Sequence, residues 1–188
     1  LISIEISDDS KLRTIGDEAF YNTNIENITI TSDLVDLKDG WCIGTPNLDK
    51  IRVSPKNPRY FCYDGKMIIG KTKIEQNNYD CLVFCVRNIK HVKIPSFIEH
   101  ICSYSFDYCY QIESIEFSDD SKLQTIDESA FTFSNITSIK IPPSVTSIGF
   151  DAFSNCELKV IKILDDSKLQ KIGGNAFNST YIESITIP

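Results

Sequence analysis

The stretch Ile139-Lys-Ile-Pro-Pro-Ser-Val-Thr-Ser-Ile-Gly-Phe-Asp-Ala-Phe-Ser-Asn-Cys156 sets the pattern of the whole chain. It opens with Ile139 and Ile141, which alternate around one lysine. An aliphatic pair and a phenylalanine follow, at Val145, Ile148 and Phe153. Alternation with a period of two is typical of a short strand whose alternate side chains point inward. We interpret the second group as the segment that returns the chain to the next strand.

This arrangement recurs throughout the sequence. Apolar residues at offsets 0, +3 and +5 mark units that begin at residues 1, 25, 48, 89, 112, 136, 158 and 182. The steps between them are 22 to 24 residues, apart from one of 41. A unit this short cannot bury its apolar face alone, so neighbouring units must stack. We therefore predict one repeat solenoid over residues 1–188, β-rich, with eight parallel strands joined by short helical turns.

The repeat resembles the BspA-type leucine-rich repeat, whose pattern Ile-x-Ile-Pro-x-Ser-Val-x-x-Ile-Gly-x-x-Ala-Phe-x-x-Cys is almost complete at 139–156. The 41-residue step between the units that begin at 48 and 89 strengthens the resemblance. Asn57-Pro-x-Tyr60, then Asp64-Gly65 and Met67-Ile68, are similar to the family's hairpin insertion, which the resemblance places at about 54–88. The resemblance covers the whole chain. It implies a leucine-rich repeat solenoid, α/β in the sense used for that class.

The resemblance also carries an expectation about function. It implies a surface-exposed or secreted recognition protein that adheres to host or extracellular-matrix proteins, and some family members are linked to fibronectin and fibrinogen. No motif in these repeats marks a ligand, so the fold transfers better than the function.

Composition excludes several other functions. The 188 residues hold 19 Lys and Arg against 26 Asp and Glu, which gives a net charge of −7. An acidic chain is a poor main partner for nucleic acid or an anionic membrane. The longest apolar stretch, Cys81 to Val86, is far too short to span a bilayer, so we expect no direct membrane insertion. The chain begins at Leu1, and we interpret it as a fragment without its own targeting signal.

Neither the cysteines nor the acidic links predict a cofactor or metal. There are seven cysteines, and Cys109 and Cys156 occupy a repeat slot that elsewhere holds Ser or Thr. Buried free thiols are the favoured interpretation, with a disulfide involving Cys62 or a metal site as alternatives. The repeated Asp-Asp-Ser-Lys links at 8–11, 119–122 and 165–168 could offer calcium ligands, but capped, solvated turns explain them better.

Catalytic chemistry has little support in the sequence. The chain has only two histidines, and His100 and Cys102 lie two residues apart with no third group indicated. Catalysis requires convergent acidic, basic or nucleophilic groups. We therefore expect no enzyme and no catalytic residues, although a deep polar pocket would revive that possibility.

The outward face of the predicted strands is the most informative surface. The columns that flank the central strand aliphatic carry five Lys or Arg against Glu5 and Glu116, or +3 on a chain of −7. A basic strip of this kind suits an acidic partner. A simple structural explanation competes, because Glu116 lies between Lys93 and Lys140 as cross-strand pairing would place it. The candidate binding residues are Lys50, Arg52, His91, Lys93, Lys140 and Lys162.

These observations favour a non-enzymatic module that binds proteins through its strand face. The alternative is a structural or scaffolding solenoid that self-associates through open repeat ends.

Overall fold

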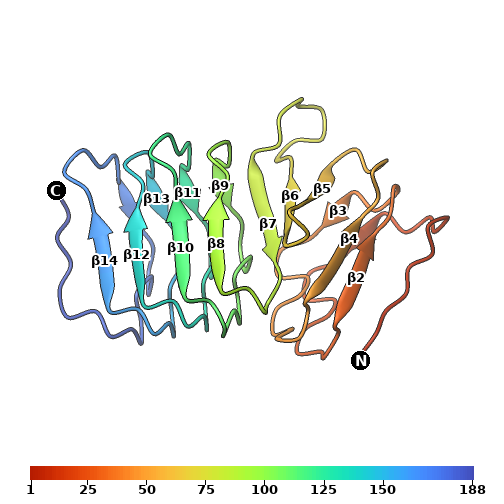
Figure 1. Ribbon diagram of the computed structural model, residues 1–188, viewed down its shortest axis with the longest axis horizontal. Helices are drawn as coiled ribbons and strands as arrows, with labels where there is room; N and C mark the ends of the chain where they lie inside the picture. The colour runs from red at the N-terminus through yellow and green to blue at the C-terminus, as the bar shows by residue number, and fades with distance from the viewer.

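The computed structural model describes residues 1–188 and is a β-solenoid without helices (Figure 1). Its front layer consists of four-residue strands, one for each of six units. They are β2 (Asn27–Ile30), β4 (Lys50–Val53), β8 (His91–Ile94), β10 (Ser114–Phe117), β12 (Ser138–Ile141) and β14 (Val160–Ile163). These strands pair in parallel as β2–β4, β8–β10 and β12–β14. The predicted repeat solenoid with parallel strands is confirmed.

Two parts of the expectation are wrong. Eight front strands were expected, but segments 1–6 and 182–187 form none despite their apolar spacing. Residues 1–6 accept backbone bonds from the next unit, from Asn24 N to Leu1 O and from Glu26 N to Ile2 O, and Ile4 and Ile6 pack against the core. The expected helical turns are also absent. In their place lies a back layer of two-residue strands: β1 (Thr14–Ile15), β3 (Asp36–Leu37), β9 (His100–Ile101), β11 (Thr125–Ile126), β13 (Ser147–Ile148) and β15 (Lys171–Ile172).

Left-handed residues explain why the return segments do not become helical. Each return turn has two residues with positive φ, four positions apart, such as Asp151 (52°) and Asn155 (56°). A left-handed residue in every turn prevents helical hydrogen bonds from continuing. The backbone bonds instead to the adjacent repeat, as where Phe131 N donates to Ala152 O at 2.8 Å and Phe153 N to Ala176 O at 2.8 Å.

The insertion is built into the back layer. Strand β6 (Met67–Gly70) pairs antiparallel with both β5 (Tyr60–Tyr63) and β7 (Cys81–Cys85), and β7 then pairs in parallel with β9. The result is a seven-stranded sheet in the order β15-β13-β11-β9-β7-β6-β5. At the other end of this sheet the side chain of Tyr60 on β5 reaches β3, where Leu37 N donates to its hydroxyl at 3.1 Å.

A single hydrophobic core of 41 buried residues lies between the layers. The repeat phenylalanines stack through it: the Phe131 ring lies 4.8 Å from Phe106 and 5.0 Å from Phe153, both nearly parallel. The unit that lacks this phenylalanine places buried Trp41 next to Cys42, and Phe84 of the insertion packs 5.6 Å from its ring.

Candidate functional site

The front strands present the predicted binding residues to solvent. All six side chains are exposed: Lys50 and Arg52 on β4, His91 and Lys93 on β8, Lys140 on β12, Lys162 on β14. Their exposure follows from the strand alternation, which buries Val92 and Ile94 on the opposite face of β8. None of the five Lys and Arg side chains in this set has a carboxylate within ion-pair distance.

Lys140 and Lys162 form a cationic pair across two neighbouring strands of this face. The register of β12 and β14 places them directly opposite each other. Like charges in that position repel, so a bound anion relieves their repulsion. Lys140 also borders a hollow of about 530 Å³ that Glu116, Asp119 and Asp166 line, whereas Lys162 borders one of about 700 Å³ with Lys159 and Glu183. The cationic character is therefore stronger on the β14 side.

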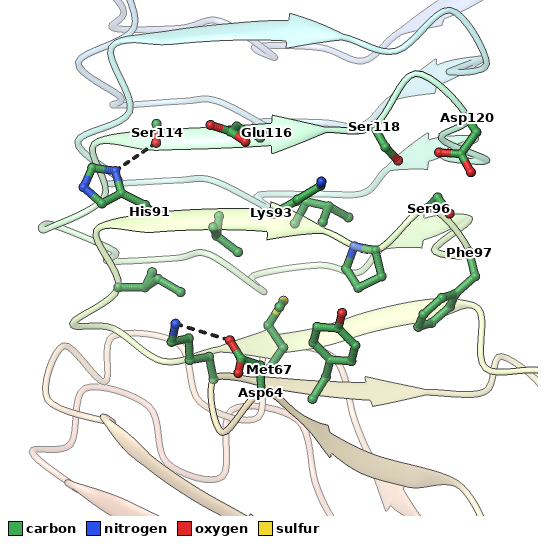
Figure 2. Close-up of a pocket in the computed structure, with 16 residues that line it drawn as sticks. Asp64, Met67, His91, Lys93, Ser96, Phe97, Ser114, Glu116, Ser118 and Asp120 are labelled. Atoms are coloured by element: carbon green, nitrogen blue, oxygen red, sulfur yellow. Dashed lines mark hydrogen bonds and ion pairs between the residues drawn. The ribbon is translucent and has the colours of Figure 1, made fainter.

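His91 and Lys93 line a separate groove of about 950 Å³ (Figure 2). A hydrogen bond of 3.0 Å joins His91 Nδ1 to Ser114 Oγ, and His91 Nε2 lies 3.6 Å from Glu113 Oε2. The β8–β10 register places Glu116 opposite Lys93, which agrees with the cross-strand charge pairing considered from the sequence. His91 is therefore held by its neighbours, and Lys93 has the freer charged group.

The hairpin turn of the insertion forms the opposite wall of the groove. Asp64 and Met67 lie across from β8, and Phe97 lies toward one end (Figure 2). Lys66 Nζ forms an ion pair with Asp64 Oδ2 at 3.3 Å. Sequence reasoning missed this wall. The available signals were the 41-residue step and the Asp64-Gly65 turn, but neither shows which surface the turn approaches.

The six predicted residues therefore do not form one continuous strip. The front layer is divided into three two-stranded pieces, and the break between β4 and β8 separates Lys50 and Arg52 from the rest. His91 and Lys93 line the groove, and Lys140 and Lys162 form a pair two strands further along.

The other candidate groups from the sequence are the cysteines and the Asp-Asp-Ser-Lys links. All seven cysteines are free thiols, and burial raises the pKa of Cys42 to about 12 and that of Cys156 to about 11. No group of three or more His, Cys, Asp or Glu has metal-binding geometry. In each of the three Asp-Asp-Ser-Lys links the serine Oγ accepts a bond from the backbone N–H two residues later, at 3.2 to 3.3 Å. The links are thus capped turns.

Fold and repeat together define a leucine-rich repeat solenoid. The family model described as "BspA type Leucine rich repeat region (6 copies)" matches residues 1–63 and 72–188. The chain belongs to the BspA-type leucine-rich repeat family. No curated protein matches it significantly. The structure has no helix long and apolar enough to cross a membrane.

Three solved structures are similar to this fold. A leucine-rich cell surface protein from Faecalibacterium prausnitzii shares 21% identity over 95% of this chain and 57% of its own, with a TM-score of 0.64. A leucine-rich repeat protein from Eubacterium ventriosum shares 19% identity over 93% of this chain and 64% of its own, with a TM-score of 0.65. The pneumococcal vaccine antigen PcpA shares 20% identity over 97% of this chain and 54% of its own, with a TM-score of 0.56. The chain thus spans between 54% and 64% of their lengths.

Proposed function

We propose that this chain is a non-enzymatic protein-binding module of a cell-surface or secreted protein. It binds an acidic region of a host or extracellular-matrix protein through its front strands. The observation that carries the proposal is the pair Lys140 and Lys162, which lie exposed and opposite each other without a carboxylate partner. Support for the compartment comes from the F. prausnitzii cell surface protein and the pneumococcal antigen.

Elementary electrostatics supports this surface over the rest of the molecule. The chain carries −7, so an acidic partner is repelled at most orientations and attracted where unpaired cations gather. Such a surface increases association rate and selectivity more than affinity. Binding is therefore expected to weaken as salt rises, since the Debye length is about 8 Å at physiological ionic strength.

The test measures binding to immobilised fibrinogen and fibronectin by surface plasmon resonance. The variant Lys140→Glu/Lys162→Glu is expected to bind about tenfold more weakly, mainly through a slower association rate. The control Lys168→Glu/Lys171→Glu changes exposed lysines off the front strands and has the same net charge, −7 − 4 = −11. Equal weakening in both variants would contradict a specific strand-face site.

Light scattering at the binding concentrations separates this function from the scaffolding alternative. A monomeric chain that binds through Lys140 and Lys162 supports the module. Self-association that persists in the Lys140→Glu/Lys162→Glu variant, together with no matrix binding by the wild-type chain, favours the scaffold.

A further inference from the structure

The two layers of the solenoid contain different numbers of strands at the insertion. The units that begin at 25, 89, 112, 136 and 158 each contribute one front strand and one back strand, whereas the unit that begins at 48 contributes β4 to the front layer and is followed by β5, β6 and β7 in the back sheet. Two additional strand spacings amount to about 10 Å. The back layer is wider than the front layer by about that distance here, which leaves β4 and β8 unpaired with each other, and Figure 1 shows β6 and β7 in the interval between them.

The edge of β8 that faces this opening is unpaired. Glu113 N and Ser114 N donate to Lys90 O at 2.7 and 3.1 Å. These bonds fix which residues of β8 form the hydrogen bonds of the β8–β10 ladder. In a parallel ladder alternate residues bond to the same neighbour, so residues 90, 92 and 94 face β10. The N–H and C=O groups of His91 and Lys93 point the other way. Neither residue forms a backbone bond outside the ladder.

The groove of about 950 Å³ lies along this open edge. Tyr63 and Phe97 give it exposed apolar surface, and its charged lining is Lys66 and Lys93 with Asp64, Glu116 and Asp120. Asp64 forms an ion pair with Lys66, so Lys93 is the lysine left to meet a bound strand. On the paired edge of β8, Lys93 faces the carboxylate of Glu116 across the strands. A strand on the open edge would face the same cation, so a carboxylate in the matching position is complementary.

We propose that this groove binds an extended peptide segment of the partner protein, which adds to the open edge of β8 and carries an acidic residue opposite Lys93. Unpaired strand edges are templates for such addition: backbone bonds supply affinity and alternate side chains supply selectivity. The inference rests on the proposed protein-binding function and specifies the form of the partner. Its site is distinct from the Lys140 and Lys162 pair.

The probe is a synthetic peptide with the sequence of residues 111–118, Gln-Ile-Glu-Ser-Ile-Glu-Phe-Ser, which already pairs with β8 in this fold. Nuclear magnetic resonance titration of the ¹⁵N-labelled chain should shift the amides of His91 and Lys93, and the bound peptide should slow their hydrogen exchange. A peptide with Lys in place of its second Glu should bind about three- to tenfold more weakly.

Proline substitution separates backbone pairing from side-chain charge. Lys93→Pro removes an outward N–H that takes no part in the β8–β10 ladder, and proline is tolerated at strand edges. It should abolish peptide binding, whereas Lys93→Gln, which keeps the N–H, should retain it with about threefold lower affinity. The exchange measurement on the wild-type chain needs no variant and stands if Lys93→Pro fails to fold.

Unchanged exchange at His91 and Lys93 with saturating peptide, or peptide shifts confined to other strands, would overturn the proposal. So would equal binding by folded Lys93→Pro and Lys93→Gln. The Lys140→Glu/Lys162→Glu variant should bind the peptide normally. If matrix proteins fail to bind but the peptide protects β8, the proposed partner class fails and the groove assignment stands. If matrix proteins bind and β8 is unaffected, the proposed partner class stands and the groove assignment fails.

Discussion

Arg87 connects the insertion to the following repeats through a fully enclosed guanidinium. Its Nη1 donates to Ser105 O at 3.0 Å, and its guanidinium carbon lies 4.5 Å from the centre of the Phe84 ring. Arg87 is 2% exposed, so water stabilises its charge little and the surrounding protein groups must do so. Asp107 nearby accepts a bond from Gly44 N at 3.0 Å, which links the turns on either side of the insertion.

The carboxyl of Asp107 makes stability depend on pH. Burial raises its pKa from 3.8 to about 6, although the positive charge of Arg87 acts in the opposite direction. Between these values the folded chain binds a proton more tightly than the unfolded chain, so this group increases stability as pH falls from 6 to 4. The full effect is about 3 kcal/mol. Asp107→Asn keeps an acceptor for Gly44 N–H and should remove this contribution.

Urea unfolding of both proteins at pH 7, 6, 5 and 4 provides the measurement, because other carboxylates cancel in the difference. The variant should be more stable than the wild-type chain at pH 7, and the difference should shrink toward pH 4. Parallel pH profiles would show that Asp107 titrates normally.

At the scale of elements, the sequence predicted strand positions better than strand partners. The offsets around Ile28 and Ile139 correctly located front strands, since a period of two exposes one face and buries the other. The continuous apolar run Cys81 to Val86 contains β7, in which four of the five residues are buried. Nothing local showed that this strand would join the back layer beside β9, because periodicity describes faces and carries no information on neighbours. The groove was missed for the same reason, since it arises from that pairing.

Close backbone contact between repeats makes one glycine slot sensitive. A Cβ at Gly149 would meet the Asp127 carbonyl carbon at 2.6 Å, and backbone atoms cannot rotate away. Gly16 holds the same motif position, after an isoleucine, with nothing within 4 Å. Gly149→Ala should therefore lower the free energy of unfolding by about 1–3 kcal/mol. Gly16→Ala should change it by less than about 1 kcal/mol.

Thermal and urea unfolding of the two alanine variants would test this difference. Similar destabilisation in both would mean that the close approach to Asp127 does not determine the cost of a side chain at this slot. A neutral Gly149→Ala would mean that β11 and β13 can separate without cost.

Across the whole molecule, the insertion is a central part of the sheet rather than an appendage. All four residues of β6 are buried, and the strand is paired on both sides, with β5 and β7. The seven-stranded back sheet continues across the break that divides the front layer. The two halves of the front face are therefore held in position by the back layer, and the groove beside β8 depends on this support.

Hydrogen exchange measured by mass spectrometry would show this hierarchy directly. Amides of residues 67–70 and 81–85 should exchange at least about 100-fold more slowly than those of residues 72–78, the mostly exposed loop between them. Segments 1–7 and 182–188, which form no strands, should exchange as fast as that loop. Because the loop belongs to the same insertion, it serves as an internal control for sequence and solvent. Exchange of β6 and β7 at the rate of the loop would mean that the insertion opens independently, and the groove wall at Asp64 and Met67 would then be transient.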